Sequence, residues 1–256
     1  MSRQTLPKII KTSIVEHPVL SVITLAIVFL FVQYLPLFVL PMISGFAQKF
    51  IGKVLISILA IWLITTLDWW KEAGFATPSH WQMWKPFLPL FILPVLSALV
   101  SDFTLTNPWQ IGLITIYVIT VGFAEEALVR GIFLRAIKPK GVLKAALLSS
   151  LIFGLMHFAN LLMGADLGNT LTQVIYATLI GIAFSGTLIY TGSIYPLIII
   201  HTLVDLFPRL EDVSEVSRSI SLTNALIMIG VQIPFAIYGF WLLRQRMKST
   251  IKQTQK

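Results

Sequence analysis

The chain has 256 residues, of which 56% are hydrophobic and only 12% are charged. Ordinary soluble domains carry about 25% charged residues, so this composition excludes a soluble globule, and 17 Phe and 7 Trp among long aliphatic runs exclude a disordered chain. The formal net charge is +8. Because basic loops orient membrane proteins, we attribute this charge to membrane topology and expect no nucleic-acid partner. The chain contains no Cys and therefore has no disulfide framework, thiolate metal site or thiol nucleophile.

The apolar runs are continuous and lack the alternation that a membrane β-barrel requires. They predict an all-α polytopic membrane protein, a single integral membrane domain over residues 1–256 with about eight transmembrane helices around a polar cavity. The first run is too long for a signal peptide, and Lys53 in the second is expected to snorkel to the interface. Three prolines in the third run predict either a kinked span or a re-entrant segment. The expected spans are residues 18–40, 50–67, 86–101, 108–137, 142–163, 168–190, 194–207 and 219–243.

The basic residues are distributed unevenly over the two sides that eight spans define. Fifteen of the 19 Lys and Arg residues fall on the side that carries both termini, and four fall on the other side. The positive-inside rule therefore predicts an integral protein of the cell membrane with both termini in the cytoplasm. Membrane lipids surround such a protein, and the sequence leaves its oligomeric state open.

Five titratable side chains lie inside the apolar runs, where an ionised group costs roughly 2.5–3.5 kcal/mol at the bilayer centre. They come from three expected helices, and one shared polar cavity satisfies them better than three isolated defects. Such residues indicate a functional site by default. They are Glu125, Glu126, His157, His201 and Asp205.

Helical spacing gives these groups different expected partners. Glu126 and Arg130 are i, i+4 with the acid first, which favours an ion pair and a structural role for Glu126. Glu125 has no partner at i+3 or i+4 and is therefore the better candidate for a general base. His201 and Asp205 share one helix face, so we expect Asp205 to fix the imidazole tautomer or to donate a hydrogen bond.

His157 has two neighbours of its own on the fifth expected helix. Phe153 lies one turn earlier and is expected to pack beside the imidazole, and Asn160 is a further polar candidate at i+3.

These groups suit three kinds of chemistry. A water between Glu125 and His157 would be deprotonated for attack on a carbonyl, while His201 with Asp205 stabilises the oxyanion. Alternatively, Glu125, His157 and His201 would bind zinc, although the chain has no His-Glu-x-x-His motif. Carboxylates and His on three helices also fit a proton or cation path in a transporter.

Three motifs occur in order over about residues 108–207, and each lies on its own expected span. They are Glu125-Glu126-x-x-x-Arg130-Gly131, Phe153-x-x-x-His157 and His201-x-x-x-Asp205. This pattern resembles the CPBP family of intramembrane proteases, which includes the CAAX prenyl endopeptidases of eukaryotes and the bacterial Abi proteins. The resemblance implies a motif-bearing protease core at about 108–207 and a cavity that faces the cytoplasm.

The resemblance also implies a glutamate-type endopeptidase that needs no cofactor, with zinc as the alternative. Glu125 and His157 would activate water, and His201 with Asp205 would form the oxyanion site. The family often has Asn where this chain has Asp205, and Asp donates a hydrogen bond only when it is protonated. The supporting residues would be Glu126, Arg130, Phe153 and Asn160.

The expected reaction is hydrolysis of a peptide bond in a membrane-associated or lipidated peptide. Two other functions remain open at this point: a peptide-binding membrane protein of the bacteriocin-immunity type and an ion-coupled transporter.

Overall fold

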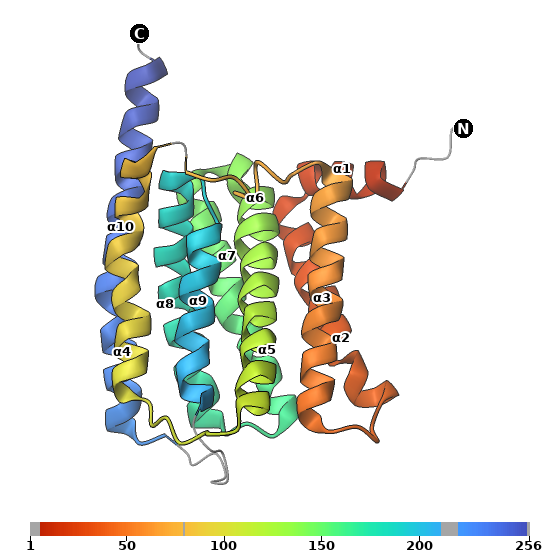
Figure 1. Ribbon diagram of the computed structural model, residues 1–256. Coiled ribbons are helices and arrows are strands. Elements are labelled where there is room, and N and C mark those ends of the chain that lie inside the picture. The colour runs from red at the N-terminus through yellow and green to blue at the C-terminus, as the bar shows by residue number, and fades with distance from the viewer. Residues whose placement is uncertain (1–5, 79, 211–219, 255–256) are drawn as a thin grey trace.

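The structure is a computed structural model that describes residues 6–78, 80–210 and 220–254, and these form helices joined by short loops (Figure 1). The α-helices are α1 (Leu6–Glu16), α2 (Pro18–Val39), α3 (Gly45–Leu67), α4 (Ile92–Val100), α5 (Pro108–Glu126), α6 (Leu134–Ile137), α7 (Val142–Met156), α8 (Leu167–Thr191), α9 (Tyr195–Leu206) and α10 (Leu222–Thr254). Five 3₁₀ or π segments extend them: η1 (Trp81–Phe91), η2 (Ala127–Phe133), η3 (Lys138–Lys140), η4 (His157–Met163) and η5 (Phe207–Leu210). The prediction of an all-α polytopic membrane protein is confirmed.

Seven helical segments in the described part of the chain are long and apolar enough to cross a membrane. The remaining helix of the expected eight, α9, has only 12 residues, about 18 Å at 1.5 Å per residue. This helix carries two of the titratable residues. It is too short to span the hydrocarbon core, which is about 30 Å thick.

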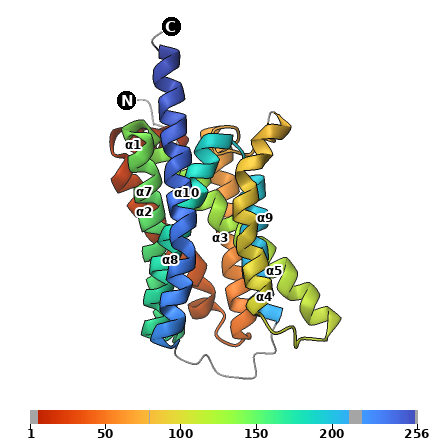
Figure 2. The ribbon, with the colours of Figure 1, turned by 90° about the vertical axis from the view of Figure 1, so that its left-hand side faces the viewer.

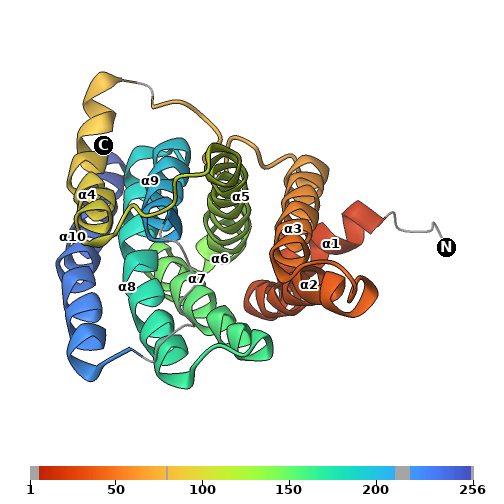
Figure 3. The ribbon, with the colours of Figure 1, turned by 60° about the horizontal axis from the view of Figure 1, so that its bottom comes forward.

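The helices stand roughly side by side, with α1 and the C-terminal end of α10 at the same end of the bundle (Figures 1 and 2). Viewed toward the opposite end, α4 and α10 form one edge and α1 to α3 form the other (Figure 3). Between these edges lie α5, α7, α8 and α9, which carry the sequence motifs. The motif residues are therefore enclosed by helices from both ends of the chain.

Several expected boundaries differ from the observed ones. The third expected span begins earlier, as the 3₁₀ helix η1 at Trp81, and continues through α4 to Val100, where it has crossed the bundle (Figure 1). The fourth continues as expected past residue 126, in a helical stretch that reaches Lys140. Its middle is the π-helix η2, which the sequence did not predict, and π-helical turns are frequent at functional sites. The last helix extends beyond residue 243 to Thr254, and α1 was not expected.

Two glycines allow close helix approaches beside the motif residues. A Cβ at Gly122 of α5 would lie 2.5 Å from Thr202 Oγ1 and 3.1 Å from the Ile198 carbonyl oxygen, both on α9. A Cβ at Gly52 of α3 would overlap the backbone of Gln33 on α2. These contacts bring α9 against α5 and α2 against α3, and so determine which side chains meet between them.

Candidate active site

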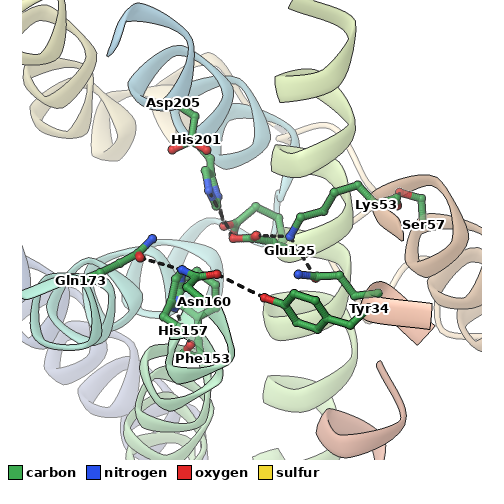
Figure 4. Close-up of polar contacts among 12 residues, drawn as sticks. Tyr34, Lys53, Ser57, Glu125, Phe153, His157, Asn160, Gln173, His201 and Asp205 are labelled. Atoms are coloured by element: carbon green, nitrogen blue, oxygen red, sulfur yellow. Dashed lines mark hydrogen bonds and ion pairs between the residues drawn. The ribbon is translucent and has the colours of Figure 1, made fainter. Parts of the chain in front are cut away.

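Glu125 lies near the end of α5 and pairs with a lysine from another helix. Lys53 of α3 places its Nζ 2.6 Å from Glu125 Oε1 (Figure 4). The same nitrogen lies 3.1 Å from Gln33 Oε1. The side chains of Lys53 and Glu125 are only 10% and 16% exposed. The expectation that Lys53 snorkels to the interface is therefore wrong, and so is the expectation that Glu125 is unpaired, because its partner comes from outside its own helix.

The neighbouring Glu126 and Arg130 form the ion pair that their spacing predicted. Arg130 Nε lies 3.2 Å from Glu126 Oε2, and both side chains are fully buried. The guanidinium carbon lies over the rings of Phe153 and Phe184, 4.9 and 5.3 Å from their centroids. These aromatic faces stabilise a cation whose two terminal nitrogens have no hydrogen-bond partner among the described residues.

His201 of α9 joins the two adjacent carboxylates. Its Nδ1 lies 2.8 Å from Glu126 Oε1, and its Nε2 lies 3.6 Å from Glu125 Oε2. The first contact is a hydrogen bond, and the second is too long for one. With Glu126 paired to the Arg130 guanidinium, its Oε1 accepts the hydrogen bond from Nδ1, and Nε2 then carries a proton only when the ring is an imidazolium.

Asp205 occupies a different position from the one its spacing predicted. Its Oδ2 lies 3.1 Å from Arg209 Nη1, and the same nitrogen donates to the Asp205 backbone oxygen. Glu126, rather than Asp205, is therefore the residue that fixes the His201 tautomer. The expected tautomer-fixing role of Asp205 is wrong, because Glu126 takes the only ring nitrogen that is not directed at Glu125.

His157 lies where α7 changes into the 3₁₀ helix η4. Its Nδ1 is 3.0 Å from the Phe153 carbonyl oxygen, and the two rings meet edge to face with centroids 4.9 Å apart. The expected packing of Phe153 against His157 is confirmed. Since a carbonyl oxygen only accepts, Nδ1 donates the proton, and Nε2 keeps a lone pair.

Asn160 belongs to a separate hydrogen-bond chain beside these groups. Its Oδ1 accepts from the Tyr34 hydroxyl at 3.2 Å, and its Nδ2 donates to Gln173 Oε1 at 2.8 Å. This chain ties η4 to α2 and α8 (Figure 4). Asn160 thereby anchors the segment that begins with His157.

The expected zinc ligands do not form a metal-binding group. No cluster of three or more His, Asp or Glu side chains in the described ranges is arranged to hold a metal ion. Glu125 Oε1 already carries the Lys53 ammonium, and His157 Nδ1 contacts a carbonyl oxygen. The carbonyl contact leaves His157 Nε2 free, whereas the Lys53 ammonium would compete with a metal ion for Glu125 Oε1.

Sequence reasoning missed Lys53, Gln33 and Tyr34, all from the first two spans. Lys53 is buried within the second span, and Gln33 and Tyr34 interrupt the first. Polar residues at similar depths in two neighbouring spans could have indicated a contact between them. A lysine near a helix end is, however, also typical of snorkelling to the interface.

Comparison with known families supports the family resemblance that the three motifs indicated. Residues 107–207 match the family described as type II CAAX prenyl endopeptidase Rce1-like. The match includes the Glu-Glu, His157 and His201 motifs and excludes α1 to α4 and α10. No curated protein and no solved structure shows a significant match to the chain.

Proposed function

Residues 107–207 match the type II CAAX prenyl endopeptidase Rce1-like domain family, and we propose from this premise that the protein hydrolyses a peptide bond of a membrane-associated or lipidated peptide. The observation that carries the proposal is the meeting of Glu125 and His201 within that domain. Two helices bring them together, with Glu125 Oε2 and His201 Nε2 3.6 Å apart. This gap leaves one carboxylate oxygen without a direct hydrogen bond to the imidazole and able to contact a water.

In the proposed reaction, Glu125 is the general base. The water lies between Glu125 Oε2 and the Nε2 lone pair of His157, donating one hydrogen bond to each. Glu125 takes a proton as the water oxygen bonds to the peptide carbonyl carbon, and the carbonyl oxygen becomes an oxyanion. Glu125 then returns the proton to the departing amine nitrogen as the C–N bond breaks.

His201 is the proposed oxyanion donor. An imidazolium Nε2–H points toward the developing charge, and Glu126 holds the ring by its Nδ1. Asp205 lies one turn further along α9 and is proposed to complete the oxyanion site when its carboxyl group is protonated. The supporting residues act indirectly: Arg130 holds Glu126, Phe153 orients His157, and Asn160 anchors η4.

Cleavage assays with the purified full chain test this reaction. Glu125→Gln and His157→Ala should each lower kcat for a fluorogenic lipidated peptide by about 10²–10⁴-fold, the usual contribution of general acid–base catalysis. The matched controls are Glu16→Gln and His17→Ala, which are exposed near the end of α1 and should leave cleavage unchanged. Wild-type cleavage by both site variants would refute the mechanism.

Two further assays separate the alternatives. We propose a reaction that needs no metal, and the contact of Lys53 with Glu125 supports this. A chelator should therefore not lower cleavage activity. Loss of activity on chelation, with recovery when zinc is added, would contradict the proposal. Flux of ions in proteoliposomes that Glu125→Gln abolishes, with no peptide cleavage, would favour a transporter. Peptide binding without cleavage would favour an immunity-type protein.

We also propose that both termini lie in the cytoplasm of the cell, as the charge asymmetry predicts. Helix lengths place the site inside the bundle, away from both of its ends. His157 follows the 15-residue helix α7, about 22 Å from its start on the terminus side. Lys53 is eight residues into α3, about 12 Å from the opposite end.

Burial supports access from that opposite face. Toward the termini, Glu126, Arg130 and the rest of η2 are buried. Away from the termini, the Asp205 and Arg209 side chains are 25% and 41% exposed. This exposure supports a second proposal, that peptides enter from the side opposite the termini rather than from the expected cytoplasmic side.

The absence of Cys makes this topology directly testable. A membrane-impermeant maleimide on intact cells should label Ser221→Cys and Asp205→Cys but not Ser249→Cys. Labelling of Ser249→Cys alone would reverse the orientation. Labelling of Asp205→Cys only after the cytoplasmic face is opened would refute outer access.

A further inference from the structure

Lys53 is a buried charge that lies outside the family-matched segment yet contacts its first motif. It belongs to α3, whereas the match covers residues 107–207. A lysine inside a span costs several kcal/mol unless it is paired or reaches water. Lys53 is 8% exposed as a residue, so pairing is what keeps it there.

The contacts of Lys53 are directed at one oxygen of Glu125. Its Nζ lies 2.6 Å from Oε1, and Gln33 Oε1 accepts a second hydrogen bond from the same nitrogen at 3.1 Å. Gly52, the residue before Lys53, lets α2 approach closely enough to supply Gln33. The ammonium is therefore held in place from two helices rather than left mobile.

No other permanent cation contacts Glu125 among the described residues. Arg130 pairs with Glu126, and Arg209 pairs with Asp205. The remaining neighbour, His201, is 3.6 Å away and is charged only when protonated. Lys53 thus provides the charge that keeps Glu125 ionised in a low-dielectric site.

We propose that Lys53 is a positioning residue for the general base. It fixes Oε1 and holds Glu125 as a carboxylate, so that Oε2 is the oxygen presented to water. This inference rests on the proposed function of Glu125. It implies that residues 107–207 form an incomplete site, because the counter-ion of the base comes from α3 and its orientation from α2.

Kinetics on three variants of the full chain test the proposal. Lys53→Met should lower kcat by about 10²-fold or more while KM stays within about twofold, since the base is lost and the peptide-binding surface is kept. Lys53→Arg, which restores a cation, should recover most of the lost kcat. Lys49→Met is the matched control, because Lys49 lies one turn earlier on α3, is exposed, and should behave as wild type.

Infrared spectroscopy measures the protonation of carboxyl groups, which a simple loss of packing would not change. Without Lys53, no fixed positive charge among the described residues contacts the buried Glu125 carboxylate, and burial favours its neutral form. Lys53→Met should therefore show a protonated-carboxyl band in addition to any in wild type, and Lys53→Met/Glu125→Gln should lack this additional band.

The outcomes separate this proposal from the proposed function. Wild-type kcat in Lys53→Met, with Glu125→Gln inactive, would overturn the role of Lys53 alone. If Lys53→Met does not fold, the Lys53→Arg variant tests the proposal instead. A folded but inactive Lys53→Arg that shows no carboxyl band would also overturn the proposal. Full cleavage by Glu125→Gln would overturn the proposed function first.

Discussion

The buried pair of Glu126 and Arg130 allows a quantitative prediction. Its Nε and Oε2 atoms are 3.2 Å apart, and neither side chain is exposed. At an effective dielectric of about 20, two unit charges at this distance attract by roughly 5 kcal/mol. Removing one partner leaves the other charge buried, which costs about 3–5 kcal/mol.

The two single replacements should not be equal. Glu126→Leu leaves a guanidinium that keeps only the two aromatic rings, each worth about 0.5–2 kcal/mol. Arg130→Met leaves a carboxylate that keeps its hydrogen bond to His201 at 2.8 Å. We therefore expect Glu126→Leu to cost about 3–5 kcal/mol of unfolding free energy and Arg130→Met to cost less.

The double replacement isolates the interaction. Exchanging both charges for apolar side chains removes the unpaired charge, so Glu126→Leu/Arg130→Met should cost at least about 2 kcal/mol less than the sum of the single changes. Unfolding by SDS in mixed micelles, followed by fluorescence of the seven Trp residues, measures these free energies. The control is Arg209→Met, whose pair is more exposed and should cost about 0–1 kcal/mol. Additive free energies, or single changes below about 1 kcal/mol, would refute the reasoning.

Replacements at three more sites have defined expected outcomes. Gly122→Val should abolish cleavage, because its side chain would push α9 and His201 away from α5, whereas Gly112→Val on the same helix meets open space and should cleave normally; the same peptide assay compares them. Gly239→Leu should lower the unfolding free energy by about 1–3 kcal/mol through overpacking, since a Cβ there lies 2.6 Å from Ala183 Cα of α8; an unchanged midpoint in the mixed-micelle assay would contradict this. Asp205→Asn should keep kcat within about tenfold because an amide donates without prior protonation, while Asp205→Ala should lose about 10²-fold if the side chain serves the oxyanion; equal activities would remove Asp205 from the site.

Local sequence patterns were sufficient for much of the fold and for part of the site. Continuous apolar runs placed most of the spans, because burying about 20 apolar residues in a bilayer requires little information about neighbours. The i, i+4 spacing of Glu126 and Arg130 predicted their ion pair, and the spacing of Phe153 and His157 predicted their contact. Both pairs lie within one turn of a single helical segment.

Tertiary structure decided which partner each catalytic candidate has. Glu125 meets Lys53 across 72 positions in the chain, and Glu126 meets His201 across 75. Neither contact has a periodic signature, because it depends on how closely α3, α5 and α9 approach. Asp205 has the spacing to serve His201 but pairs with Arg209 instead, since Glu126 already contacts the ring. The sequence by itself determined that charged groups lie inside the membrane domain, and helix packing determined how they are paired.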